Sequence, residues 1–528
     1  MSILAKLRLP YREDVVFSLL GFAVFLTPLI FSAYAYESFE SVKFSTLLLC
    51  VGAALFAFFW KKGKVVLNYN KYLYGLLVLF GFWAVLSSIF SLDRLYSLIG
   101  FYYRYTSGLA FYAVFLVFIF LLFNTLTRER LEYLLKILVL DAFLVAIISF
   151  VQGFGWLFYP GLEFSGFFRG PSLLGNADFS AMFMAVPVPL VIYFLVKSAS
   201  QWSRLYYGLA GFFILLAEFI LASRGALLAI ACSLGFSLLL LLIFKFPKKL
   251  FLAVCLGSLA ALVLGYLVIG VSRPSAVSSI ITSSDANTSS RFYAWEVSLK
   301  GVLDHPFLGS GPGAYELFFE ASRPAEFASQ IGVFDDAHNI FLNLADTGGL
   351  PLVLLFIAVI LTAIFYGFKE LKTTKDLLPL ILMSALLAWT VGASFNPIPI
   401  PMYLLFAILI VGLFLQHIKT RQLVPSPVSK YFLIFLGSII FAVGLISLVS
   451  EHFLGFAQRS YNSQNYQTSY NLSNAAYDIN PTNKYFLSYK VASAIKLKMD
   501  RTGIITDIKK IQNLHPTQAE TYISASNM

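Results

Sequence analysis

Charge is scarce in this sequence. Only 12% of the 528 residues are Asp, Glu, Lys or Arg, whereas a soluble domain carries about 25%. Hydrophobic residues make up 59% of the chain, and its mean hydropathy is +0.79. These values exclude an ordinary soluble protein. They indicate a polytopic membrane protein, in which each run of roughly 17–25 apolar residues crosses the bilayer as a helix.

Cysteine and histidine are also rare. The three cysteines, Cys50, Cys232 and Cys255, all lie inside apolar runs, at no spacing typical of a zinc site or a disulfide framework. The five histidines are scattered over different loops and over both sides of the predicted membrane. We therefore expect no metal centre, and the sequence predicts no other cofactor.

Apolar runs fill most of the chain. Thirteen of them are candidate spans, the first being an uncleaved span rather than a secretory signal. They are residues 15–35, 44–60, 72–90, 108–123, 134–154, 179–196, 205–222, 226–244, 250–271, 350–368, 377–395, 402–415 and 431–450. We predict an all-α polytopic membrane protein with about 12 or 13 transmembrane helices. The weakest candidate is 402–415, because it is short and follows three prolines.

Lysine and arginine are distributed unevenly among the loops between these runs. Most of them lie on alternate loops, for example Lys61, Lys62, Lys64, Lys245, Lys248, Lys249, Lys369, Lys372 and Lys375. Positive residues in short loops are retained in the cytoplasm, so the N-terminus is predicted inside, with the 271–350 interval and the tail outside. The net charge of +11 thus reflects membrane topology. We expect membrane lipids as partners and no nucleic acid.

The predicted spans divide the chain into four parts. Residues 1–270 hold the first nine helices, 271–350 form a polar external loop, 351–450 hold the remaining helices, and 451–528 form an external helical tail. In the tail, Pro481 and Pro516 stand in similar motifs 35 residues apart, close to the tetratricopeptide period of about 34. A plain helical tail with two proline-initiated helices explains the motifs equally well, so both interpretations stay open.

Arg224 lies in an unusual place. Ser223-Arg224-Gly225 interrupts an apolar stretch at 205–244 that is too long for one span, which predicts two spans joined by a tight external turn. An arginine at the membrane surface is costly unless it faces protein or water. This favours a functional arginine over one that merely reaches the lipid headgroups.

The external loop holds a second arginine. Arg291 and Trp295 are four residues apart and share one face of a predicted helix. A guanidinium binds phosphate oxygens through several hydrogen bonds, but Arg291 taken alone is more typical of a solvated surface residue. The following turn, with Gly311 and Gly313, offers backbone amides to a phosphate. It lacks the Lys-Ser or Lys-Thr of a nucleotide loop, and by itself it predicts only a turn.

His338 stands at the start of an amphipathic segment that leads into the next span. A neutral imidazole can accept a proton from a hydroxyl, and a nearby carboxylate can set its tautomer. Asp335 or Asp336 is close enough in the sequence to do so. The alternative is a structural histidine, the usual role of a single one.

The order and spacing of these motifs resemble the signature region of the bacterial O-antigen ligase and polymerase superfamily. The resemblance rests on Arg291 with Trp295, the segment 305–313, the segment 338–342, the segment 346–350, and the turn at 223–226. It covers about 170–415 well and the first spans only by pattern. Many relatives carry Glu where this chain has Asp346, and Gly where it has Pro351.

The resemblance implies a GT-C-like fold and a glycosyltransferase. The implied reaction is an inverting, metal-independent transfer of a glycan from an undecaprenyl pyrophosphate donor to an acceptor hydroxyl, at the outer face of the bacterial cytoplasmic membrane. By the same resemblance, His338 is the base that activates the acceptor, and Arg224 and Arg291 hold the donor pyrophosphate. The acceptor, whether glycan, lipid or protein, stays open, and so does the choice between ligase, polymerase and protein oligosaccharyltransferase.

Two more external arginines are candidates for supporting roles. Arg104 lies among tyrosines in the segment 97–108, and Arg169 begins the segment 169–178. The tyrosines themselves are more typical of a membrane-interface belt. Two other classes of function remain: a transporter or flippase without bond chemistry, and a scaffold that acts through its tail.

Overall fold

The computed structural model describes residues 14–60, 65–155, 169–247, 286–322 and 334–514, with the single positions 263 and 267. In this part of the chain, nine helices are long and apolar enough to cross a membrane. Three shorter apolar helices, Val15–Leu26, Leu109–Thr125 and Leu377–Ala393, accompany them. The all-α polytopic class is therefore confirmed. The expected span 250–271 and the motif around Pro516 lie outside the described residues.

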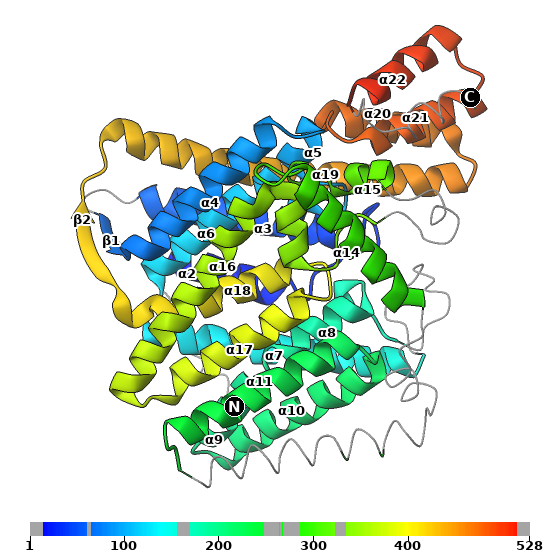
Figure 1. Cartoon of the computed structure of the whole chain (residues 1–528). Coiled ribbons are helices and arrows are strands. Elements are labelled where there is room, and N and C mark those ends of the chain that lie inside the picture. Colours follow the sequence, from blue (N-terminus) through cyan, green and yellow to red (C-terminus); the bar gives the residue numbers. More distant parts are fainter. Residues whose placement is uncertain are drawn as a thin grey trace.

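The first half of the chain runs from α2 to α11 (Figure 1). It begins with α2 (Val15–Leu26), α3 (Glu40–Trp60), α4 (Lys71–Ile89), α5 (Arg94–Ile99), the 3-10 turn η1 (Tyr105–Ser107), α6 (Leu109–Thr125) and α7 (Arg128–Gly153). It continues with the turn η2 (Ser172–Leu174), α8 (Ala177–Ala185), α9 (Val188–Lys197), α10 (Gln201–Leu221), against which α7 packs, and α11 (Arg224–Ile243).

The second half begins with two helices of the predicted external loop, α14 (Ala286–Asp304) and α15 (Tyr315–Ser322). The remaining helices are α16 (Ile340–Thr374), α17 (Leu377–Ala393), α18 (Ile400–Phe414), the turn η4 (Leu415–His417), α19 (Pro427–Asn462), α20 (Tyr466–Ile479), α21 (Lys484–Lys496) and α22 (Arg501–Leu514). The last three are successive short helices beyond the final apolar run.

Polar residues at the ends of the apolar runs fix where many helices begin. Asn70, Thr127, Asn176, Asn339 and Asp376 each accept a hydrogen bond from a backbone amide in the first turn of the helix that follows. Such caps satisfy amides that have no partner within the helix. The loop residues therefore set the start of α8 and α16, two helices that begin next to the candidate site.

Helix α18 corresponds to the weakest span candidate in the sequence, and it is enclosed by protein. All 15 of its residues are buried. A helix of this length rises only about 22 Å, less than the roughly 30 Å of a bilayer core. Protein covers it: α18 packs against α16, α17 and α6, and the Trp389 Nε1 donates to the carbonyl of Met402 at 2.8 Å. Its short length is possible because it does not face lipid.

A small sheet, which the sequence did not predict, joins two loops. Strands β1 (Val65–Tyr69) and β2 (Lys419–Leu423) pair antiparallel, with Val65 opposite Leu423. Figure 1 shows the sheet at one end of the bundle, with α14, α15 and the tail helices at the other. It ties the α3–α4 loop to the α18–α19 loop on the side predicted to face the cytoplasm.

Helix α19 continues from the last apolar run into the tail without a break at the expected boundary of 450/451. Just past that point, Glu451 accepts hydrogen bonds from the Tyr102 hydroxyl at 2.8 and 3.0 Å. The ring of Tyr102 also lies 4.9 Å from that of Tyr485 in α21. The tail is therefore attached to the external loop that carries Arg104. The four-part division of the chain stays a prediction.

Candidate functional site

His338 is held by the residue two positions before it. Its backbone is left-handed, with φ at +53°, and its amide donates to the Asp336 Oδ1 at 2.7 Å. The ring Nδ1 lies 3.0 Å from the Asp336 carbonyl oxygen. A carbonyl oxygen can only accept a hydrogen bond, so Nδ1 must carry the proton. The lone pair is then on Nε2, where it is able to take a proton.

The surroundings of His338 favour its neutral form. Burial lowers the pKa of the ring, and the positive charges of Arg291 and Arg104 lower it further, against the opposing effects of Asp336 and Asp335. Burial and the charge of Asp335 raise the pKa of Asp336 to about 7. A neutral imidazole near pH 7 is the state that a general base requires.

Arg104 links the external loop that carries it to the segment that carries Asp335 and His338. Its Nε lies 2.7 Å from the Asp335 Oδ2. Burial disfavours the charge of the guanidinium, but Asp335 and Asp336 outweigh this and raise its pKa. The same guanidinium lies over the Phe179 ring, 5.3 Å from the centroid. Arg104 thus joins the segment before α16 to the first turn of α8.

Arg291 projects from α14 toward two polar side chains. Its Nη2 donates to the Asn396 Oδ1 at 3.2 Å and lies 3.5 Å from the Asp178 Oδ2. One turn further along, the ring of Trp295 lies 6.2 Å from that of Phe395. The Trp295 Nε1 is buried and has no hydrogen-bond partner among the described residues.

Arg169 reaches the same carboxylate from another direction. Its Nη2 lies 2.6 Å from the Asp178 Oδ1, and its Nε donates to the Leu221 carbonyl. Ser223 also hydrogen-bonds Asp178 through its side chain, which explains why this N-cap residue of α11 makes no capping bond. Asp178 therefore connects three segments that are far apart in the sequence.

Arg224, the first residue of α11, lies beside the same region. A Cβ placed on Gly225 would be 3.3 Å from the Phe395 Cβ and 3.4 Å from the Asn396 Nδ2. The turn that carries Arg224 therefore packs against the residue that accepts the hydrogen bond of Arg291. The two predicted donor-binding arginines come from adjoining segments.

Residues 209–357 match the family described as O-antigen ligase. An O-antigen ligase domain thus occupies the middle of the chain, and it contains Arg224, Arg291 and His338. No curated protein matches the chain. The family match does not extend to the tail, so it gives no support to a tetratricopeptide segment.

Several side chains around the site lie outside the O-antigen ligase match. Arg104, Arg169, Asp178 and Asn396 come from helices and loops before or after it. The sequence did not single out Asp178 or Asn396. Asp178 had a usable signal, since it is an ionisable residue next to the apolar run 179–196. Asn396 had none, because an amide beside a proline is ordinary in a loop.

The glycine turn of the O-antigen ligase domain is packed into the protein. The amides of Ser310 and Gly311 donate to the carbonyls of Asp346 and Thr347 at 2.8 and 2.9 Å. Gly311 and Gly313 are buried, and a Cβ on Gly313 would lie 2.4 Å from the Tyr96 carbonyl oxygen. The structure therefore gives these glycines a packing role. A contact with substrate stays a prediction.

Gly311→Ala is expected to destabilise the fold. Gly311 has φ at +106°, and a Cβ there would lie 2.0 Å from the Ser91 Oγ, so the substitution adds backbone strain to overpacking, which costs about 1–3 kcal/mol. The measurement is thermal unfolding of the purified protein in detergent. Gly75→Ala in α4 is the control, because a Cβ there meets nothing within 4 Å. Equal unfolding temperatures for the two variants would contradict the packing role.

Asp346 lies within the domain but makes no described polar contact through its side chain. Both carboxylate oxygens are buried without a hydrogen-bond partner among the described residues. A Cβ on Gly301 would lie 1.8 Å from the Asp346 Oδ1, so α14 and α16 approach closely here. Within the described residues, no group of three or more His, Cys, Asp or Glu side chains is arranged to hold a metal ion.

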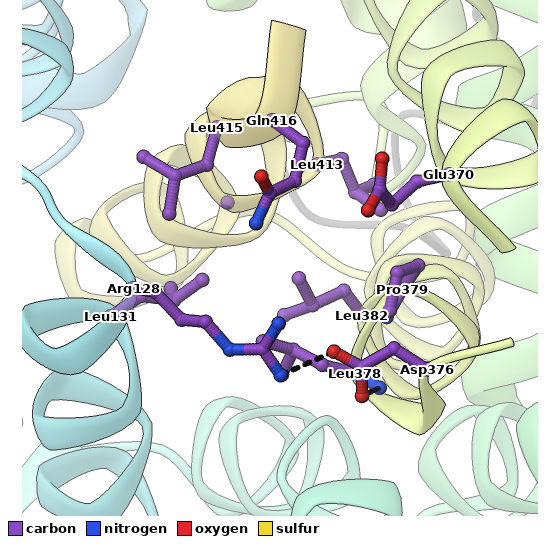
Figure 2. Close-up of a pocket in the computed structure, with 11 residues that line it drawn as sticks. Arg128, Leu131, Glu370, Asp376, Leu378, Pro379, Leu382, Leu413, Leu415 and Gln416 are labelled. Carbon is purple, nitrogen blue, oxygen red and sulfur yellow. Dashed lines mark hydrogen bonds and ion pairs between the residues drawn. The ribbon is translucent and has the colours of Figure 1, made fainter. Parts of the chain in front are cut away.

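A pocket apart from this site lies between α7, α16, α17 and α18 (Figure 2). Figure 2 shows Arg128 and Asp376 joined by an ion pair at the edge of the pocket. The remaining lining residues are Leu131, Glu370, Leu378, Pro379, Leu382, Gly412, Leu413, Leu415 and Gln416. The charged residues lie on loops predicted to face the cytoplasm, so this ion pair is a useful control for the one at Asp178.

Proposed function

We propose that this protein is an inverting glycosyltransferase that moves a glycan from an undecaprenyl pyrophosphate donor to an acceptor hydroxyl at the outer face of the bacterial cytoplasmic membrane. The observation that carries the proposal is His338. Its Nδ1 donates its proton to the Asp336 carbonyl, which leaves Nε2 unprotonated, and the positive charges of Arg291 and Arg104 favour this neutral form of the ring.

The reaction follows from these groups. The acceptor hydroxyl gives its proton to the His338 Nε2 while its oxygen attacks the anomeric carbon of the donor. The bond from that carbon to the pyrophosphate breaks on the opposite face, which inverts the anomeric configuration. Undecaprenyl pyrophosphate leaves with the electron pair of that bond, and Arg224 and Arg291 stabilise its negative charge. The guanidinium groups supply positive charge, so the step needs no metal ion.

The outer face is proposed from the distribution of lysine and arginine. The candidate site lies at the end of the bundle that carries α14, α15 and the tail, opposite the small sheet (Figure 1). The positive-inside rule assigns that end to the exterior. A lipid-linked donor then reaches the site from the outer leaflet, and the tail is in a position to contact a glycan, lipid or protein acceptor.

The test of the function is the glycan products of a strain that lacks the protein. Shortened chains indicate a polymerase, loss of glycan from lipid indicates a ligase, and loss of protein glycosylation indicates a protein oligosaccharyltransferase. The wild-type chain is expected to restore the missing product, whereas His338→Ala is expected not to. Full restoration of the product by His338→Ala would show that His338 is not the general base and would refute the proposed reaction.

A transporter of lipid-linked glycans is the second candidate, and one observation favours it. Asp141 in α7 and Glu218 in α10 are fully buried, and their carboxylate oxygens have no hydrogen-bond partner among the described residues. Ionisable groups inside a membrane bundle are typical of transport pathways. Movement of a lipid-linked glycan across proteoliposomes, without transfer to an acceptor, would favour this function over the first.

A further inference from the structure

The acidic side chain of Asp178 is paired with two of the arginines near the site. Its carboxylate lies 2.6 Å from the Arg169 Nη2 and 3.5 Å from the Arg291 Nη2. The backbone around it is fixed as well, because the amide of Asp178 donates to the Asn176 side chain at 2.8 Å at the start of α8. The carboxylate is therefore held at a defined place between two guanidinium groups.

We propose that Asp178 is a positioning residue that holds Arg169 and Arg291 together as a two-arginine clamp for the pyrophosphate of the donor. This inference rests on the proposed function. Two guanidinium groups that converge on one anion repel each other, and a carboxylate between them offsets that repulsion. Asp178 thus allows the two positive charges to stay close together before the donor arrives.

The arginines keep hydrogen-bonding capacity for a ligand. A guanidinium has five N–H donors, and Asp178 occupies one nitrogen of each arginine in this arrangement. The side chains of Arg169 and Arg291 are 40% and 28% exposed, compared with 25% for Asp178. The Arg169 side chain is therefore more accessible than the Asp178 carboxylate, and the Arg291 side chain is about as accessible as that carboxylate.

In the described part of the chain, each arginine has one further partner, and these partners lie on different elements. Arg169 donates to the Leu221 carbonyl at the end of α10, and Arg291 donates to Asn396 between α17 and α18. Neither contact joins one arginine to the other. Loss of the Asp178 carboxylate would leave both guanidinium groups anchored separately, with no other group among the described residues that fixes the distance between them.

The experiment uses the purified full-length protein and undecaprenyl pyrophosphate without a glycan as the probe. Asp178→Asn is expected to weaken probe binding roughly 10- to 100-fold, because charge-assisted hydrogen bonds to the phosphates are misdirected. Asp178→Glu keeps the charge and is expected to retain most of the affinity. In an Arg169→Ala/Arg291→Ala background, Asp178→Asn is expected to change binding less than about twofold, because coupled residues are not additive.

Asp376→Asn is the matched control. Asp376 is paired with Arg128 at the other end of the bundle, and its side chain is 24% exposed, against 25% for Asp178 (Figure 2). This variant is expected to bind the probe as the wild type does. If Asp178→Asn and Asp376→Asn unfold at similar temperatures but only Asp178→Asn loses affinity, the loss of affinity results from disruption of the clamp and not from a less stable fold.

Four results would overturn the inference. They are unchanged binding in Asp178→Asn, tighter binding in that variant, equal losses in Asp178→Asn and Asp178→Glu, and a loss that multiplies with the arginine substitutions. If the wild type transfers glycan and Asp178→Asn binds the probe equally well, only the inference falls. If the wild type neither binds the probe nor transfers glycan, the proposed function falls and the clamp with it.

Discussion

Replacing His338 with Ala is expected to slow glycan transfer by roughly 10²- to 10⁴-fold, the usual contribution of a positioned general base. The reason is local: the Nδ1 donates to the Asp336 carbonyl at 3.0 Å, so Nε2 is the ring nitrogen with a lone pair to offer the acceptor. The measurement is initial rate with a purified lipid-linked donor. His305→Ala is the control, because His305 belongs to the same external loop but is exposed. Equal rates in the two variants would refute the assignment.

The pH profile gives a second test of His338. Protonation removes the lone pair, so the rate falls as the pH drops through the pKa of the ring. Burial and the two nearby arginines lower that pKa from its usual 6.5, and the acidic limb of kcat/KM is therefore expected below pH 6.5. Removing the positive charge with Arg104→Gln should shift this limb toward higher pH. An acidic limb centred above pH 7 would show that another group controls the rate.

Replacing Arg291 with Ala is expected to lower kcat/KM by roughly 10²- to 10³-fold. This is the usual effect of removing one hydrogen-bond donor that stabilises a developing negative charge. Arg291 is pre-oriented by the Asn396 Oδ1 at 3.2 Å and by Asp178 at 3.5 Å, so it can meet the leaving pyrophosphate without rearrangement. The measurement is the steady-state dependence of transfer on donor concentration. Arg224→Ala is expected to impair donor use in the same way.

Two controls separate the role of Arg291 from that of charge alone. Arg291→Lys keeps the charge but loses the planar fork, so it is expected to recover only part of the activity. Arg128→Ala removes an arginine that is paired with Asp376 on the other side of the bundle and is expected to leave donor use unchanged. The assignment fails if Arg291→Ala and Arg128→Ala behave alike.

The membrane fold was predictable because apolar length is written directly in the sequence. The stretch at 205–244 became α10 and α11, with Arg224 at the first position of the second helix. The length of the apolar run was less informative for α18, because a run this short is tolerated only where protein surrounds it. The β1–β2 sheet was not predictable, because its two short strands pair residues that are 350 to 358 positions apart.

The candidate site was predictable only in its local parts. His338 and Asp336 are two residues apart, so their closeness follows from the sequence. That Nδ1 bonds the Asp336 carbonyl and not its carboxylate depends on the backbone conformation. The contact of Arg291 with Asp178 joins residues 113 positions apart, and only the fold brings them together. The contact of Arg169 with the Leu221 carbonyl and that of Arg291 with Asn396 could not be predicted for the same reason.

The uninterrupted helix α19 has a consequence for how the tail is oriented. Each residue of an α-helix turns the chain by about 100°, so the number of residues between the membrane run and Glu451 fixes the direction in which that carboxylate points. Inserting one residue before Glu451 would turn it away from the Tyr102 hydroxyl, whereas inserting seven, close to two full turns, would nearly restore its direction. The rotation of α19 about its axis therefore determines how the tail faces the external loop. Only insertions close to a whole number of helical turns preserve that orientation.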